Sequence, residues 1–218
     1  MSDQYRVYGY RWVVLGVFMF ANLMVQMLWI SYAPITSLAT EYYGVSTLAI
    51  GVLSMSFMIA FIPLAMPAAW VTDARGFRPA VTLGVLLMAV FGVTRGLAGT
   101  DYTLALLSTI GIAAAQPFLM VTWTKMPANW FAPRERATAV GLVTLASMTG
   151  IAVGMAVTPV LADLMPIARV QLLYGGLAAV AAVAFLALGR ERPATPPCPA
   201  EMQEIGRASC RERVFRVV

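Results

Sequence analysis

The sequence comprises 218 residues, of which 60% are hydrophobic and only 11% are charged, and it carries a formal net charge of +5. Soluble domains average about 45–50% apolar and about 25% charged residues, so this composition excludes an ordinary water-soluble domain. No histidine occurs, and Cys198 and Cys210 both follow the last apolar stretch. We therefore expect no metal site, no cofactor and no disulfide between spans.

Six apolar stretches are each long enough to cross a bilayer, which takes about 20 residues in a helix. Short polar segments separate them. Because strands with open edges leave backbone groups unsatisfied in lipid, each stretch is expected to be helical. The sequence therefore predicts an all-α membrane protein in which residues 1–192 form a six-helix transmembrane bundle. The predicted spans are residues 12–34, 47–71, 79–97, 102–124, 137–160 and 168–188.

Basic residues predict how the chain is oriented. With a cytoplasmic N-terminus, the opposite side of the membrane keeps only Arg95 and Arg169. We expect a multi-pass protein of an inner or plasma membrane. By the positive-inside rule, both ends of this chain are expected in the cytoplasm. Trp123, near the cytoplasmic end of the fourth span, is expected to anchor that helix at the interface. The basic residues assigned to the cytoplasmic side are Arg6, Arg11, Arg75, Arg78, Lys125, Arg134, Arg136, Arg190 and Arg192.

The sequence changes character after the sixth span. Residues 193–203 form a proline-rich polar tail, which is unable to pack as a seventh span. Residues 204–218 begin with EIGRASCRERV, a string that resembles the translation of a sequencing adapter. We interpret this tail as non-native and exclude it from the fold; a genuine basic cytoplasmic tail is the alternative. On the first interpretation the reading frame is truncated and a second half of the protein is missing.

The loop after the second span contains a charged motif, with Asp73, Arg75, Gly76 and Arg78 in close succession. An aspartate at a helix C-terminus is disfavoured by the helix dipole, so Asp73 needs compensation from Arg75, Arg78 or a neighbouring helix N-terminus. Gly76 permits a tight reversal. We expect a breakable gating loop on the cytoplasmic side. The alternative is a solvated turn that only obeys the positive-inside rule.

Two glycines in the fifth span, Gly150 and Gly154, form a small-xxx-small face. Such a face lets two transmembrane helices approach closely. We expect these glycines to serve helix packing first and any gating movement second.

The candidate substrate site consists of neutral polar and aromatic side chains. Asn22, Gln26 and Trp29 recur at helical spacing and share one face of the first span. Tyr32 and Gln116 are the further candidates. No ionisable residue is expected near mid-bilayer, which argues against proton coupling through this segment. Aromatic faces hold a poorly hydrated cation with about 2 kcal/mol or more, so a quaternary ammonium or amine fits such a site.

Packing is the alternative interpretation of these side chains. Gln26 and Gln116 would then hydrogen-bond neighbouring helices as structural glue. Trp29 would pack in the core or face lipid, and the position of Tyr32 fits either interpretation.

The Asp73-x-x-Gly76-x-Arg78 loop resembles the signature loop between helices two and three of the major facilitator superfamily. The first two spans are more closely similar to the feline leukaemia virus subgroup C receptor-related transporters. The sequence departs from that family at Ser147-Met148, where relatives carry an Asn-Gln pair. The matching strings are LWISY at 28–32, YGVS at 43–46, LSM at 53–55, IPL at 62–64, PAAW at 67–70, AQ at 115–116 and GIAVG at 150–154.

The resemblance implies the N-terminal half of a major facilitator fold, built from two inverted three-helix repeats and facing a second half across the substrate site. It also implies facilitated transport of choline or ethanolamine, with haem proposed as a substrate of some members. Trp29 and Gln116 occupy the positions that contact choline in that family.

We therefore expect a carrier that moves a small solute by alternating access. The expected partners are membrane lipid, the substrate and the missing six-helix half, with no nucleic acid among them. A proton-coupled drug or organic-anion exporter of the same superfamily remains an alternative. From other classes, the alternatives are an inactive truncated fragment and a membrane-embedded enzyme. We expect no enzyme, because no catalytic residues converge within the spans.

Overall fold

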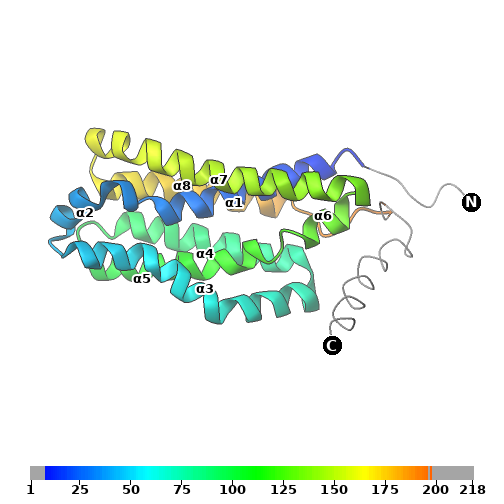
Figure 1. Cartoon of the computed structure of the whole chain (residues 1–218), viewed down its shortest axis with the longest axis horizontal. Coiled ribbons are helices and arrows are strands. Elements are labelled where there is room, and N and C mark those ends of the chain that lie inside the picture. The colour runs from blue at the N-terminus through cyan, green and yellow to red at the C-terminus, as the bar shows by residue number, and fades with distance from the viewer. Residues whose placement is uncertain (1–7, 196, 198–218) are drawn as a thin grey trace, which may run out of the picture.

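The computed structural model describes residues 8–195 and 197, and within them it contains helices and no strand. The helices run along one long axis (Figure 1). Arg6, residues 196 and 198–203 of the predicted proline-rich tail and all of the predicted tail 204–218 lie outside the described residues. The elements are α1 (Arg11–Ile30), η1 (Ala33–Ile35), α2 (Thr36–Tyr43), α3 (Thr47–Arg75), α4 (Phe77–Leu97), α5 (Tyr102–Met120), α6 (Lys125–Trp130), α7 (Pro133–Leu164) and α8 (Ile167–Leu188).

Six helical segments are long and apolar enough to cross a membrane, which confirms the prediction of an all-α protein with six spans. The first segment combines α1, η1 and α2, and the fourth combines α5 and α6. Because the spans alternate in direction, the chain enters α1 and leaves α8 at the same end of the bundle (Figure 1). We call this the terminal end, and we call the opposite end, which carries α2, the distal end.

Several helices differ in length from the spans that the sequence predicts. The first span is interrupted, because α1 ends at Ile30 and the chain resumes a helical course only from Ala33. The second span, α3, extends to Arg75, and α7 begins at Pro133, which occupies a first-turn position where no backbone donor is needed. Hydropathy marks only the part of a helix that lies in hydrocarbon, so it misses turns that continue into the interface.

The packing of the spans follows the pattern of two three-helix repeats. The most extensive contacts are α4 with α8, α4 with α5, α1 with α7, α3 with α5, and α1 with α8. Suppose that α1 corresponds to α5, α3 to α7, and α4 to α8. Each contact in this set then corresponds to another contact in the set, or, for α4 with α8, to itself. Such a correspondence is the relation expected between the halves of a 3+3 repeat.

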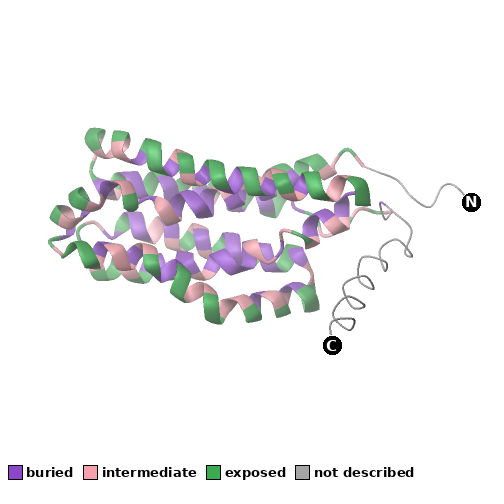
Figure 2. Cartoon of the chain, in the orientation of Figure 1, coloured by how far each residue is buried: buried purple, intermediate pink, exposed green. Residues whose placement is uncertain are grey.

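The buried side chains gather in the middle of the bundle, whereas α3 and α7 carry long exposed stretches (Figure 2). On α3 the side chains of Ile62 and Met66 are 78% and 81% exposed. Pro63 and Pro67 lie inside this helix, and prolines remove backbone hydrogen bonds and bend a helix. Apolar side chains exposed over such lengths require lipid or another apolar surface around them.

Two glycines of α7 allow the close approach of α1. A Cβ atom on Gly150 would collide with the backbone carbonyl oxygen of Leu23, and one on Gly154 would collide with the side chain of Ile30. A Cβ atom on Gly141, on the same helix, would have nothing within 4 Å of it. The α1–α7 contact therefore depends on the absence of side chains at the first two positions.

We predict that Gly150→Ala lowers the free energy of unfolding by about 1–3 kcal/mol, because the added methyl meets backbone that has no flexible side chain to move. Gly141→Ala is the matched control. It should be neutral or stabilising by roughly 0.5–1 kcal/mol, because alanine replaces glycine within a helix without a collision. Thermal unfolding of the chain in detergent measures both. Equal midpoints for the two variants would contradict this account of the α1–α7 contact.

Candidate functional site

Gln26 and Gln116 meet across α1 and α5. Gln116 Nε2 donates a hydrogen bond of 3.3 Å to Gln26 Oε1, and both side chains are buried. The structure thus brings together two residues that are 90 positions apart in the chain. Because an unpaired amide is costly in an apolar interior, this bond stabilises the contact between the two helices. The pairing is compatible with the packing interpretation and with a polar wall that faces a substrate.

Asn22 lies one turn before Gln26, and its side chain is fully buried. Trp123 Nε1 donates to Asn22 Oδ1 at 2.6 Å, and Asn22 Nδ2 donates to the carbonyl of Phe18 at 2.9 Å. The amide of Asn22 is therefore engaged on both sides. We expected Trp123 to anchor a helix at the interface. In the structure its indole is hydrogen-bonded to Asn22 of α1.

Trp29 lies one turn beyond Gln26 and faces α3. Its indole Nε1 donates to the carbonyl of Ser54 at 3.2 Å, and the side chain is only partly buried. Of the five predicted substrate residues, Trp29 is the one that keeps part of its side chain uncovered, since the other four are classed as buried. Trp29, Gln26 and Asn22 therefore form a continuous face on α1 that meets α3 and the α5 segment. We call these three residues the polar face of α1.

Tyr32 does not belong to this face. Because α1 ends at Ile30, Tyr32 no longer follows the spacing of the helix. Its hydroxyl lies 2.9 Å from the hydroxyl of Tyr43, in a buried cluster at the distal end that also includes Ile35. The structure therefore places Tyr32 apart from the other candidate residues, and its contact with substrate stays a prediction.

Arg95 is a buried residue that the sequence reasoning placed on the outer side of the membrane. Its side chain is 1% exposed, and it lies inside α4. The guanidinium donates from Nη1 to the carbonyl of Leu28 at 3.1 Å and from Nη2 to Ser31 Oγ at 3.3 Å. The expectation of no ionisable residue near mid-bilayer does not cover Arg95, which lies in the last turn of α4 at the distal end. Its position inside the predicted span 79–97 is the signal that could have identified it.

The distal end also carries a cavity of about 550 Å³ between α2 and the connection from α7 to α8. It is lined by residues such as Glu41, Tyr42 and Asp163, and none of the residues on the polar face of α1 contributes to it. A site shared between two halves presents a single wall in one half, so it need not form a cavity within this chain. The polar face of α1 is therefore a stronger candidate for a substrate wall than the distal cavity.

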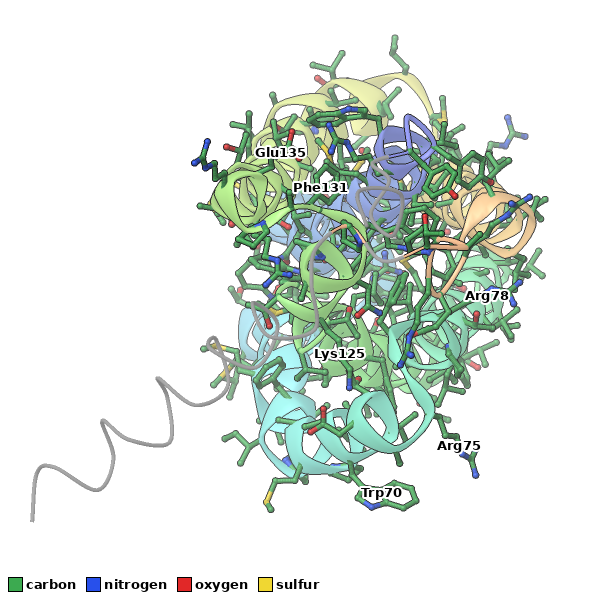
Figure 3. The ribbon with its side chains drawn as sticks, turned by 90° about the vertical axis from the view of Figure 1, so that its right-hand side faces the viewer. Trp70, Arg75, Arg78, Lys125, Phe131 and Glu135 are labelled. Carbon is green, nitrogen blue, oxygen red and sulfur yellow. The ribbon has the colours of Figure 1, made fainter. Side chains whose placement is uncertain are left out.

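At the terminal end, the charged loop after α3 is compensated by a residue at the start of α6. Lys125 Nζ lies 2.8 Å from Asp73 Oδ1 and also donates to the carbonyl of Thr72. Arg75 and Arg78 are exposed, and Figure 3 shows Arg75 extending away from the bundle while Lys125 lies near its centre. Of the three partners considered for Asp73, the structure favours the N-terminus of a neighbouring helix over Arg75 or Arg78. Lys125, the first residue of α6, supplies the positive charge.

Glu191 holds the same loop from the other side. Its carboxylate accepts hydrogen bonds from the backbone N–H of Phe77 at 3.1 Å and of Arg78 at 2.6 Å, at the N-terminus of α4. Asn129 Nδ2 also donates to it, at 3.2 Å. Gly76 has φ +98°, and a Cβ atom there would lie 2.5 Å from Glu191 Oε1. The glycine is therefore required by both the turn and the approaching carboxylate.

The sequence reasoning missed Glu191, although a lone acidic residue between two arginines was a visible signal. A carboxylate at a helix N-terminus satisfies free N–H groups and interacts favourably with the dipole. It therefore links the segment after α8 to the beginning of α4.

We predict that Glu191→Ala lowers the free energy of unfolding by about 1–2 kcal/mol, because two N–H groups at the start of α4 lose a charged acceptor. Glu41→Ala, at an exposed position of α2, is the matched control, and surface changes of that kind stay within about 0.5 kcal/mol. Unfolding of both variants in detergent provides the comparison. An equal loss in the two would show that the carboxylate does not stabilise α4.

Comparison with known proteins shows which family and which relatives this chain resembles. Residues 18–217 match the sequence profile of the Major Facilitator Superfamily. The choline/ethanolamine transporter FLVCR1 of Felis catus is 32% identical over 203 residues, which are 88% of this chain and 36% of that protein. The choline/ethanolamine transporter FLVCR2 of Homo sapiens is 30% identical over 203 residues, 88% of this chain and 38% of that protein. FLVCR2 of Rattus norvegicus is 29% identical over 202 residues, with 88% and 37% covered.

The chain thus spans somewhat more than a third of the length of these relatives. Its six apolar spans make it an integral multi-pass membrane protein, and their pairwise packing follows the two-repeat pattern. With the family profile matched over most of its length, the chain belongs to the Major Facilitator Superfamily.

Proposed function

We propose that this chain forms one half of a carrier that moves a small amine-containing solute, such as choline, by alternating access. The observation that carries the proposal is Trp29, which lies partly uncovered beside the Gln26–Gln116 pair where α1 meets α3 and α5. In this role the polar face of α1 is one wall of the substrate site. The other wall belongs to a second six-helix half.

The chemistry of a quaternary ammonium suits this wall. Such a cation donates no hydrogen bond from nitrogen, and an aromatic ring face attracts it through the ring quadrupole. The bond from Trp29 Nε1 to the Ser54 carbonyl fixes the edge of the indole, so the orientation of its face is set before a ligand arrives. Preset geometry lowers the entropy cost of binding.

The buried polar residues favour this substrate class over the proton-coupled exporter. Among the described residues, the buried polar side chains include no carboxylate, and their one charged member is Arg95. A carboxylate within the membrane is the usual carrier of a coupled proton. The relatives named as choline/ethanolamine transporters point in the same direction.

The terminal end is the proposed cytoplasmic side, because the basic residues of the described chain concentrate there. In that orientation the gating loop sits on the cytoplasmic face, where Glu191 and Lys125 hold its backbone and Asp73. The exposed side chains of Arg75 and Arg78 remain available to a second half. Contacts from such exposed charges are weak enough to form and break in each transport cycle.

We predict that Trp29→Ala raises the KM for choline uptake by roughly 30-fold, the equivalent of about 2 kcal/mol of cation–π attraction in a desolvated site. Gln116→Ala should raise it by a smaller factor, because it removes the hydrogen bond to Gln26 rather than the ring. The measurement is uptake of radiolabelled choline into proteoliposomes. They contain the protein encoded by the full reading frame in genomic DNA.

Trp70→Ala is the matched tryptophan control, because Trp70 is 65% exposed and points away from the bundle at the terminal end (Figure 3). It should leave the KM unchanged. An unchanged KM in both site variants would remove Trp29 and Gln116 from the substrate site. No choline uptake by the unaltered protein, with robust binding of a different solute, would overturn the substrate class.

A further inference from the structure

A buried polar cluster lies where α1 ends, and the proposed substrate wall does not include it. Arg95 from α4 donates to the Leu28 carbonyl and to Ser31 Oγ. Ser31 Oγ also lies 3.4 Å from Gln171 Oε1 of α8, and it donates to the Leu28 carbonyl at 2.9 Å. Arg95, Ser31 and Gln171 are all 1% exposed or less. We call these three residues, with the Leu28 carbonyl, the distal clamp.

Within the described part of the chain, the charge of Arg95 has no carboxylate partner. The ion pairs there join Arg11 to Glu135 and Lys125 to Asp73. Arginine stays protonated in proteins, so burial cannot be relieved by loss of the proton. An isolated buried charge is strongly unfavourable. Something else in the cluster must therefore compensate it.

The end of α1 supplies that compensation. Leu28 belongs to the last turn of α1, which ends at Ile30, and the carbonyls of a last turn lack partners within the helix. They also carry the negative end of the helix dipole, which attracts a cation. The ring of Tyr32 adds a cation–π contact, with the guanidinium carbon 5.3 Å from its centroid. Arg95 thus caps α1 from a neighbouring helix.

The helices behind the clamp approach each other too closely to shift independently. A Cβ atom on Gly92 of α4 would lie 3.2 Å from the Cα atom of Gly175 of α8. One on Gly96 would collide with the backbone of Leu172, next to Gln171. Arg95 lies between these two glycines in sequence, so α4 and α8 together present Arg95 and Gln171 to Ser31. The pair forms a rigid support for the end of α1.

We propose that Arg95 is a positioning residue, which fixes the end of α1 and thereby the orientation of Trp29. Its two contacts, at Leu28 and Ser31, bracket Trp29 along the chain. The bond from Trp29 to Ser54 constrains the side chain, and the distal clamp constrains the backbone that carries it. The consequence for substrate affinity rests on the proposed function, whereas the effect on the end of α1 does not.

Arg95→Lys tests the structural part, because lysine keeps the charge and loses the fork that reaches two acceptors. Hydrogen–deuterium exchange of the chain in detergent should be about tenfold faster for the backbone amides within residues 29–35, Pro34 having none, since a local opening becomes easier. Exchange in α7 near Pro133, at the other end of the bundle, should stay unchanged. Arg169→Lys, at an arginine of the same end that lies outside the clamp, is the matched control with no expected effect. Unaltered exchange at 29–35 in Arg95→Lys would overturn the proposal.

Ser31→Ala is the second variant, for use if Arg95→Lys does not fold. It removes one of the two acceptors and keeps the arginine, so exchange at residues 29–35 should rise by a smaller factor. Unchanged exchange in this variant, with Arg95→Lys unfolded, would count against the clamp.

Choline uptake tests the consequence for Trp29. Arg95→Lys should raise the KM several-fold with kcat nearly unchanged, whereas general damage to the fold would lower the amount of active carrier and leave the KM as it was. Faster exchange without a change in KM would overturn the positioning of Trp29. If the unaltered protein takes up no choline, the proposed function fails, and the exchange measurement still decides whether Arg95 holds the end of α1.

Discussion

Polar side chains surrounded by hydrocarbon must find their partners inside the bundle, and this constraint organises the whole chain. Several buried polar contacts join helices that are separate in sequence. Gln116 joins α5 to α1, Trp123 joins the end of the same span to α1, and Thr158 of α7 lies 2.8 Å from the hydroxyl of Tyr174 on α8. Apolar packing alone fixes helix rotation weakly in lipid. The bonds from Gln116 and Trp123 therefore set which face of α1 points toward α3 and α5.

Composition and hydropathy were sufficient to predict six helical spans, because span length and the cost of charge are properties of the bilayer rather than of a particular fold. Helical spacing was sufficient to place Asn22, Gln26 and Trp29 on one face of α1. Tyr32 lies beyond that face, because the helix ends at Ile30 and the next residues turn. The predicted span 12–34 crossed this break because hydropathy does not mark it.

The partners of charged residues were harder to predict, because they depend on tertiary contacts. Asp73 pairs with Lys125 rather than with the arginines next to it in sequence, since α6 brings Lys125 to the end of α3. Arg95 was assigned to the outer side by its place along the alternating spans, which does not show that a helix end stabilises it as a buried cation. In both cases the compensating group comes from a segment whose position sequence spacing does not give.

In the proposed amine carrier, two hydrogen-bond acceptors of the wall already accept a bond from a neighbouring side chain. Gln26 Oε1 receives the bond from Gln116, and the Ser54 carbonyl receives the bond from Trp29. A primary ammonium carries donors that lose water on entry and need acceptors in return, so it would have to compete for these atoms. A quaternary ammonium needs only an apolar surface and a ring face. In the proposed carrier, these two contacts, which also hold the helices together, therefore favour a cation without N–H donors.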